Sequence, residues 1–183
     1  MKNTPDDQKA IQQMPRAVED KNCWSMPAAS GRARIDCALV ACSEKSDALV
    51  CQVEVIGEFW PRGRIEPGTD TTNDFHVALP QVLVDFKSLK SLRERLVEWQ
   101  VNPSDFSVAL GVQGEGDQRL TFAIGRGDSL IYSAGKPACT FTYACGSAMQ
   151  GRWSFVVDQS CIRLCAEDIG EFVRTLEATH DQS

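Results

Sequence analysis

The sequence predicts an α+β fold: an antiparallel sheet built from two pseudo-repeated, strand-rich halves, each ending in one helix packed on the sheet. Three observations favour this class. From Ala33 onward, apolar and polar residues alternate over short stretches, which is typical of half-buried strands. Two other segments place apolar residues at steps of three and four, the period of a helix. The same order of strands and helix occurs twice along the chain.

The chain has 183 residues, which suits one domain of ordinary size. Its N-terminal segment is expected to be a flexible tail, because Met14, Trp24 and Met26 follow no period and prolines interrupt it. A single α+β domain is expected to follow this tail. The expected tail covers residues 1–31, and the domain covers residues 32–180. Its two pseudo-repeats cover residues 33–100 and 104–178.

The first half contains three strand-like stretches and a short apolar step before its helix. A long connection rich in glycine and proline separates the second stretch from the third. Pro80 ends the third stretch, since proline cannot donate to a strand ladder. The apolar residues that share a face are Ile35, Cys37, Leu39 and Ala41, then Leu49, Cys51, Val53 and Val55, then Phe75, Val77 and Leu79, followed by Val82 and Val84.

The helix of the first half is the clearest element of the sequence. Asp85 is expected to be its N-cap, because an aspartate side chain accepts a hydrogen bond from a free amide of the first turn. Asn102 and Pro103 are expected to end it, since proline breaks the hydrogen-bond ladder of a helix. Its apolar stripe consists of Phe86, Leu89, Leu92, Leu96 and Trp99.

The second half repeats this organisation with further strands and a final helix. Glu167 and Asp168 are expected in the first turn of that helix, where the helix dipole favours negative charge. The apolar residues of the expected strands are Phe106, Val108, Leu110 and Val112, then Leu120, Phe122 and Ile124, then Cys139, Phe141 and Tyr143, then Trp153, Phe155 and Val157. Those of the final helix are Ile169, Phe172, Val173 and Leu176.

Two shifts relate the halves to each other. A shift of 71 residues places Ile35 on Phe106 and Leu49 on Leu120, so it relates two strands and the turn between them. A shift of 80 relates the third strand, the apolar step and the helix to the end of the chain. It places Phe75, Val82, Val84 and Leu89 on Phe155, Ile162, Leu164 and Ile169. Chance alignment of alternating segments remains the alternative to a structural repeat.

Charge and composition limit the classes of function. The net charge is −6, from 19 basic and 25 acidic residues, which disfavours nucleic acid as a partner. No apolar run is long enough to span a bilayer, so no membrane partner is expected. The N-terminal segment has no apolar core of a secretory signal, which predicts a cytoplasmic protein.

The eight cysteines are expected to be mainly structural thiols. No pair has the C-x-x-C spacing of a zinc site, so no metal and no cofactor are expected. Cys37, Cys51 and Cys139 fall on the apolar phase of strands, where free cysteine behaves as a small hydrophobe. A metal site and a disulfide remain the minor alternatives.

Catalytic motifs do not emerge from the sequence, so no catalytic residue is assigned and a non-enzymatic protein is expected. His76 is one of two histidines and lies on the polar phase between Phe75 and Val77, which predicts that it faces solvent or a polar rim. The Cys145-Gly146-Ser147 segment follows a strand without the context of an activated nucleophile.

The connection from Gly57 to Asn73 is the strongest candidate for a functional surface. This connection is about seventeen residues long, and loops of this length are often functional. Residues 43–74 include three basic and seven acidic residues. Acidic residues therefore flank the aromatic residues and arginines of this segment, and such a combination is typical of specific protein interfaces. The alternative is that Phe59 and Trp60 cap the edge of the core. The candidate partner-binding residues are Glu54, Glu58, Trp60, Arg62, Glu66, Asp70 and Asp74.

The order of elements over about residues 33–178 resembles that of bacterial polymorphic-toxin immunity proteins of the wall-associated-toxin immunity (WapI-like) type. Three segments carry the likeness: 74–79 with the helix that ends at Leu96-Val97-Glu98-Trp99, the strand pair 106–112 and 120–124, and 153–160 with the closing helix. The N-terminal tail departs from the compact pattern of that type. The resemblance implies a non-enzymatic inhibitor that binds a cognate toxin or effector domain and blocks it by charge-complementary contact.

Two other functions remain open from the sequence. The first is an adaptor or chaperone-like module that binds a secreted effector and leaves it active. The second is a hydrolase with an unrecognised site, which would need a pocket lined by groups such as His76, Glu54 or Cys145. The sequence does not define an oligomeric state.

Overall fold

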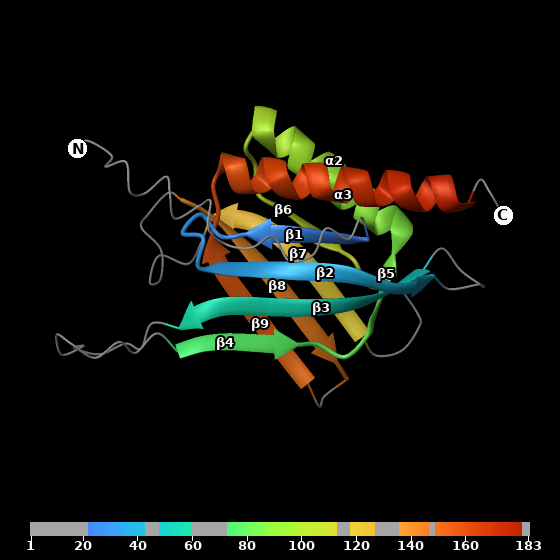
Figure 1. Ribbon diagram of the computed structural model, residues 1–183. Coiled ribbons are helices and arrows are strands. Elements are labelled where there is room, and N and C mark those ends of the chain that lie inside the picture. The colour runs from blue at the N-terminus through green and yellow to red at the C-terminus, as the bar shows by residue number, and fades with distance from the viewer. Residues whose placement is uncertain are drawn as a thin grey trace.

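The structure is a computed structural model that describes residues 22–42, 48–59, 73–112, 118–126, 136–146 and 149–180. These residues form two antiparallel sheets and two helices (Figure 1). Each sheet is followed in the chain by one helix, so the predicted α+β class and its division into two halves are confirmed.

Sheet A comes from the first half of the chain. Its strands are β1 (Cys23–Pro27), β2 (Ala33–Cys42), β3 (Ala48–Phe59), β4 (Asn73–Ala78) and β5 (Val82–Asp85). The order is β1-β2-β3-β4, and β5 pairs with the other end of β3, so β4 and β5 lie along the same edge of β3. A tight turn joins β1 to β2, and Gly31 takes a φ of 70° there, a conformation that glycine adopts without strain.

Sheet B comes from the second half and is a simple meander in the order β6-β7-β8-β9. Its strands are β6 (Phe106–Ala109), β7 (Gln118–Arg126), β8 (Pro137–Cys145) and β9 (Met149–Val156). In Figure 1 sheet A lies in front of sheet B, and the strands of the two sheets cross obliquely. Backbone bonds link the sheets, among them Asp85 N to Leu110 O at 2.8 Å and Ala29 N to Val156 O at 2.9 Å.

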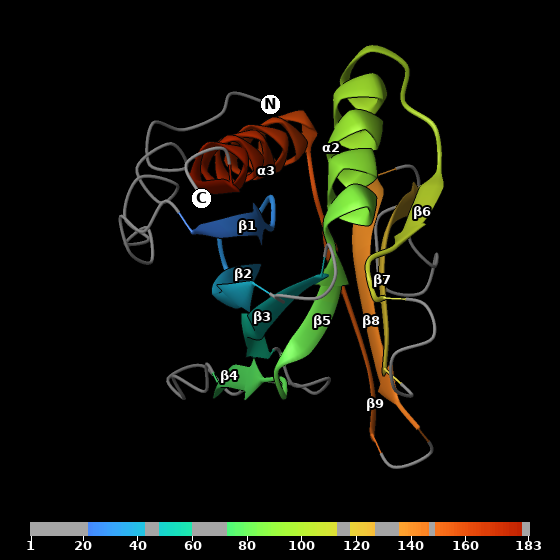
Figure 2. The ribbon, with the colours of Figure 1, turned by 90° about the vertical axis from the view of Figure 1, so that its right-hand side faces the viewer.

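Helix α2 (Phe86–Val101) follows β5, and α3 (Gln159–His180) follows β9. The helices are antiparallel neighbours, because Lys90 near the start of α2 pairs with Glu177 near the end of α3, and Gln159 bonds to the carbonyl of Gln100. Helix α3 lies along β1, and α2 contacts β5 and β6. Both helices therefore cover the same side of the molecule, opposite β4 (Figures 1 and 2).

The N-cap of α2 is the predicted one. Asp85 accepts a hydrogen bond from Ser88 N at 2.7 Å. Leu89, Leu92 and Leu96 are fully buried, so the apolar stripe read from the sequence faces the core. The helix ends before Pro103, where Asn102 N still donates to Glu98 O.

The core lies between the two sheets and beneath the helices. Trp24 of β1 meets Phe122 of β7 edge to face, with ring centroids 6.4 Å apart, which joins the inner faces of the two sheets. Both rings are buried, as are Tyr143 and Phe172. One continuous cluster includes residues from both sheets and both helices, so the two halves share one core.

The ordered fold begins before the domain boundary predicted at residue 32. Cys23–Pro27 form β1, and Trp24 and Met26 are buried against the rest of the core. These two residues are spaced by two, which is the strand period, but a strand of five residues beside a proline gives too short a pattern to recognise. The part of the expected tail before residue 22 lies outside the described residues.

Helix α3 begins earlier than predicted. Asp158 accepts a hydrogen bond from Cys161 N at 2.9 Å, and the helix begins at Gln159. Glu167 and Asp168 therefore lie inside the helix and not in its first turn. The sequence pattern missed the first turns because two of their buried residues are cysteines, Cys161 and Cys165.

The pseudo-repeat holds for the strand pairs and fails in its details. The pairs β2–β3 and β6–β7 are both antiparallel, as the shift of 71 predicts. Their registers differ by two residues, because Cys37 pairs with Val53 whereas Val108 pairs with Phe122. The shift of 80 is wrong for the apolar step, since Ile162 and Leu164 lie in α3 and their counterparts form β5.

Candidate functional site

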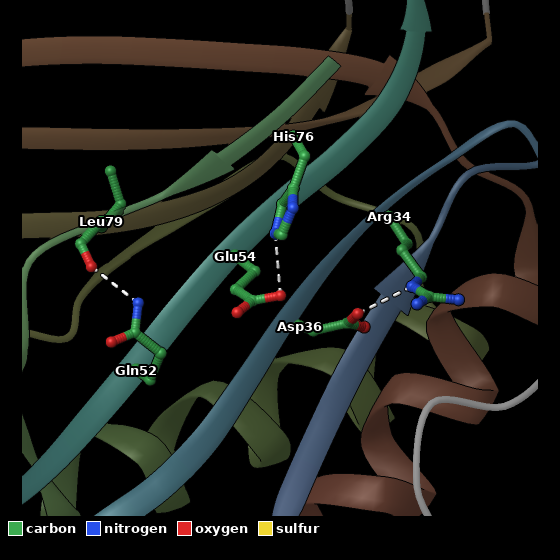
Figure 3. A network of polar contacts seen from close by, with 6 residues as sticks. All are labelled: Arg34, Asp36, Gln52, Glu54, His76 and Leu79. Atoms are coloured by element: carbon green, nitrogen blue, oxygen red, sulfur yellow. Dashed lines mark hydrogen bonds and ion pairs between the residues drawn. The ribbon is translucent and has the colours of Figure 1, made fainter. Parts of the chain in front are cut away.

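The outer face of sheet A carries the polar residues of its strands. Strand alternation buries Ile35, Val53 and Val55 on the inner face and places the residues between them on the opposite side. This outer face, defined here by Arg34, Asp36, Gln52, Glu54 and His76, is drawn in Figure 3.

Glu54 and His76 form a cross-strand pair on this face. Oε2 of Glu54 and Nε2 of His76 are 2.9 Å apart, and the ionised carboxylate only accepts, so the imidazole N–H is the donor. Their side chains are 38% and 57% exposed. Glu54 lies on β3 opposite Ala78, and His76 lies on β4 opposite Ile56, so the contact is diagonal. The prediction that His76 faces solvent is confirmed.

Asp36 lies beside this pair, directly opposite Glu54 in the β2–β3 register. Its Oδ2 accepts from Nε of Arg34 at 2.7 Å, and both side chains are largely buried. Among the described residues, no group bonds to the buried Oδ1 of Asp36. Carboxylates directly opposite each other in a sheet repel, and Arg34 and His76 flank the two here and reduce that repulsion.

Gln52 fixes the end of β4 relative to β3. Its Nε2 donates to the carbonyl of Leu79 at 2.7 Å, and Leu79 N donates to Val53 O at 2.9 Å. These bonds hold the chain where it passes from β4 towards β5. The strands that carry Glu54 and His76 are therefore held rigidly relative to each other.

The predicted interface residues are only partly described. Glu54 is on the outer face of sheet A, and the backbones of Glu58 and Asp74 are register partners at the far end of β3 and β4. Trp60, Arg62, Glu66 and Asp70 lie outside the described residues, as does the connection that contains them. Their assignment stays a prediction.

Sequence reasoning missed Arg34 and Asp36 as part of the site. The signal was present, because both occupy the polar phase of a strand whose apolar phase is Ile35 and Cys37. The alternation of residues does not reveal the register between β2 and β3, and this register places Asp36 opposite Glu54.

The cysteines are packed into the core in a way that opposes nucleophilic chemistry. None of the eight is in a disulfide, and five are buried: Cys37, Cys51, Cys139, Cys161 and Cys165. Burial raises the pKa of Cys139 and Cys165 well above that of an exposed thiol, and it raises the pKa of Cys161 to about 11. The adjacent Cys51 thiol, together with burial, raises the pKa of Cys37. The protonated thiol is not the nucleophilic form, so Cys37, Cys139, Cys161 and Cys165 act as core residues.

Cys145 does not join the histidine of sheet A. It ends β8 in sheet B, and Gly146 after it takes a φ of 54° in the following turn. Of the residues named as examples for the lining of a hydrolase pocket, His76 and Glu54 are thus brought together, and Cys145 lies in the other sheet. Within the described ranges, no group of three or more His, Cys, Asp or Glu residues is arranged to hold a metal ion.

Comparisons with known proteins give no relative. No protein-family model matches the chain, and neither does any curated protein or solved structure. Among the described helices, none has the length and apolar character needed to cross a membrane.

Proposed function

We propose that the protein is an immunity protein that binds a cognate bacterial toxin or effector domain in a stoichiometric complex and blocks its activity. The observation that carries this proposal is the outer face of sheet A, where Glu54 and His76 are held on paired strands and remain accessible beside the largely buried Arg34–Asp36 pair. Glu54, predicted from the sequence as a partner-binding residue, is exposed there beside His76. The resemblance in element order to WapI-like immunity proteins supports the same function.

The composition of the strands of sheet A favours a basic partner. Its strands contain one arginine, Arg34, and five carboxylates. The carboxylates are Asp36, Glu54, Glu58, Asp74 and Asp85. An acidic surface accelerates association with a basic protein and disfavours other acidic proteins. Toxins that act on nucleic acids are commonly basic, so the net charge of −6 suits them as targets.

Co-expression with the toxic domain encoded by a neighbouring gene tests the proposal. The wild-type protein should restore growth, and Glu54→Lys should restore it less, because the change reverses a charge on the outer face of sheet A. Glu98→Lys is the matched control, since Glu98 is an exposed glutamate on α2 that also pairs with a neighbouring basic group, Arg95. If the toxin remains lethal with the wild-type protein, the proposed function is wrong.

Two other functions make different predictions for the same complex. An adaptor would bind the effector but leave its activity unchanged, so the activity of the purified complex separates an adaptor from an inhibitor. The Glu54–His76 hydrogen bond is the observation that favours a hydrolase, because a carboxylate orients an imidazole for proton transfer in many enzymes. Substrate turnover by the purified protein that is abolished in His76→Ala would establish the hydrolase instead.

A further inference from the structure

The edges of the two sheets are not equally covered. Helix α3 lies along β1, α2 contacts β6, and β5 is bridged by Val84 to Gly111 (Figures 1 and 2). Among the described residues, no strand pairs with the outer side of β4, and one backbone hydrogen bond reaches the outer side of β9, from Ala29 N to Val156 O. An uncovered edge is a template for a strand of another chain.

The register identifies the backbone groups that β4 leaves unpaired. Leu79 N donates to Val53 O, so this residue pair is a hydrogen-bonded one. Hydrogen-bonded and non-hydrogen-bonded pairs alternate along an antiparallel ladder, so Val77 and Phe75 bond to β3 in the same way. The backbone N–H and C=O groups of Asp74, His76 and Ala78 therefore point away from β3, towards the free edge.

The side chains of β4 also have room for a neighbour. Phe75 and Val77 lie on the inner face and are only partly buried, although both pack against the core. A strand added beside β4 would cover them with its own inward-facing side chains. The other open edge differs in charge, because β9 contains Arg152 and no carboxylate whereas β3 and β4 contain three carboxylates and no lysine or arginine.

We propose that a basic partner docks by adding a strand to β4, which extends sheet A by one strand. This inference rests on the proposed function and specifies how the partner is held. The occupant is an extended segment with alternating residues, apolar towards Phe75 and Val77 and basic towards the side of Glu54. Backbone hydrogen bonds to Asp74, His76 and Ala78 hold the segment, and its side chains give specificity.

Amide hydrogen exchange with a defined peptide tests this docking mode. The probe is a capped six-residue peptide of alternating valine and lysine, and the control peptide alternates valine and glutamate. At about ten times Kd, the lysine peptide should slow exchange at the His76 and Ala78 amides by about tenfold. The amides of Phe75 and Val77 should change little, because they already bond to β3. The glutamate peptide should leave all four amides unchanged.

Three results would overturn the inference. They are unchanged exchange with the lysine peptide, equal slowing by both peptides, and slowing that depends on protein concentration alone. The last would show that a second copy of the chain occupies the edge.

A backbone variant separates this inference from the proposed function. Ala78→Pro removes one outward N–H and leaves the bonds to β3 in place, and proline is tolerated at sheet edges. Ala78→Thr keeps the N–H and is the control. In co-expression with the toxic domain, Ala78→Pro should lose protection and Ala78→Thr should keep it. If Ala78→Pro protects as well as the wild type, the partner does not dock by adding a strand to β4, and the proposed function is unaffected.

Discussion

The two sheets have similar inner faces and different outer faces. Both are antiparallel, both bury aromatic and aliphatic residues in one shared core, and both are followed by a helix. The outer face of sheet A carries the Glu54–His76 and Arg34–Asp36 pairs. The strands of sheet B carry no carboxylate, and cross-strand partners there include Thr121 with Thr142 and Thr140 with Ser154.

This difference is the reason why the proposed binding surface is placed on sheet A. Packing on the inner faces accounts for the fold, and the sheets differ in charge, because the strands of sheet B carry arginines but no carboxylate and so hold no ion pair between them. On sheet B the hydroxyls of Thr140 and Ser154 satisfy each other at 2.8 Å. On sheet A the cross-strand contact with His76 leaves the Glu54 carboxylate partly exposed to solvent, which suits the proposed partner-binding surface.

The largest change in the free energy of unfolding is expected for a substitution on the inner face of sheet B, compared with one on its outer face. Phe122→Ala should lower the free energy of unfolding by about 3–5 kcal/mol, because it empties the space beside Trp24 in the core. Thr121→Ala, one residue away on the opposite face, should change it by less than about 0.5 kcal/mol. Urea denaturation of the two variants measures both values. Equal losses would contradict the assignment of inner and outer faces.

The next largest effect is expected at alkaline pH and involves buried thiols on the inner face of sheet B and in helix α3. Because burial raises the pKa of Cys139 and Cys165, the unfolded chain releases these protons before the folded one does. The free energy of unfolding should be level below about pH 8.5 and fall above it, by up to about 1.4 kcal/mol per pH unit for each such thiol. Denaturation at several pH values measures the slope.

The matched variant for this pH dependence is Cys139→Val, which removes one titrating thiol and keeps an apolar side chain. Its free energy of unfolding should fall less steeply above about pH 8.5 than that of the wild type. An unchanged slope would show that the thiol at position 139 is already accessible to hydroxide in the folded protein.

The smallest effect on stability is expected on the outer face of sheet A. Glu54→Gln should change the free energy of unfolding by less than about 1 kcal/mol, because exposed ion pairs contribute little. The same variant should weaken partner binding, since it removes a charge from the binding surface. Thermal denaturation and binding of the toxic domain measure the two quantities. A large loss of stability would make Glu54 a structural residue.

Much of the fold follows from the sequence because it depends on local periodicity. The stripe of α2 and its cap at Asp85 were predictable from spacing alone. Strand β1 was not, since five residues give little pattern and their partner strand lies beyond a turn. The start of α3 was missed because cysteine gives an ambiguous signal for a buried helical position.

The site was less predictable because it depends on register. Glu54 could be found from its polar phase and the acidic segment around it, and His76 could be placed towards solvent. Their contact joins residues 22 positions apart across a long connection, which no local pattern encodes. Asp36 belongs to the site only because the β2–β3 register places it opposite Glu54.

The most direct test of the central claim is titration of the purified toxic domain with the purified protein while toxin activity is recorded. The account predicts that activity falls linearly to zero at equal amounts, that Glu54→Lys raises the amount required, and that Arg152→Glu on sheet B does not. Full toxin activity at excess protein, or a loss of inhibition only in Arg152→Glu, would contradict it.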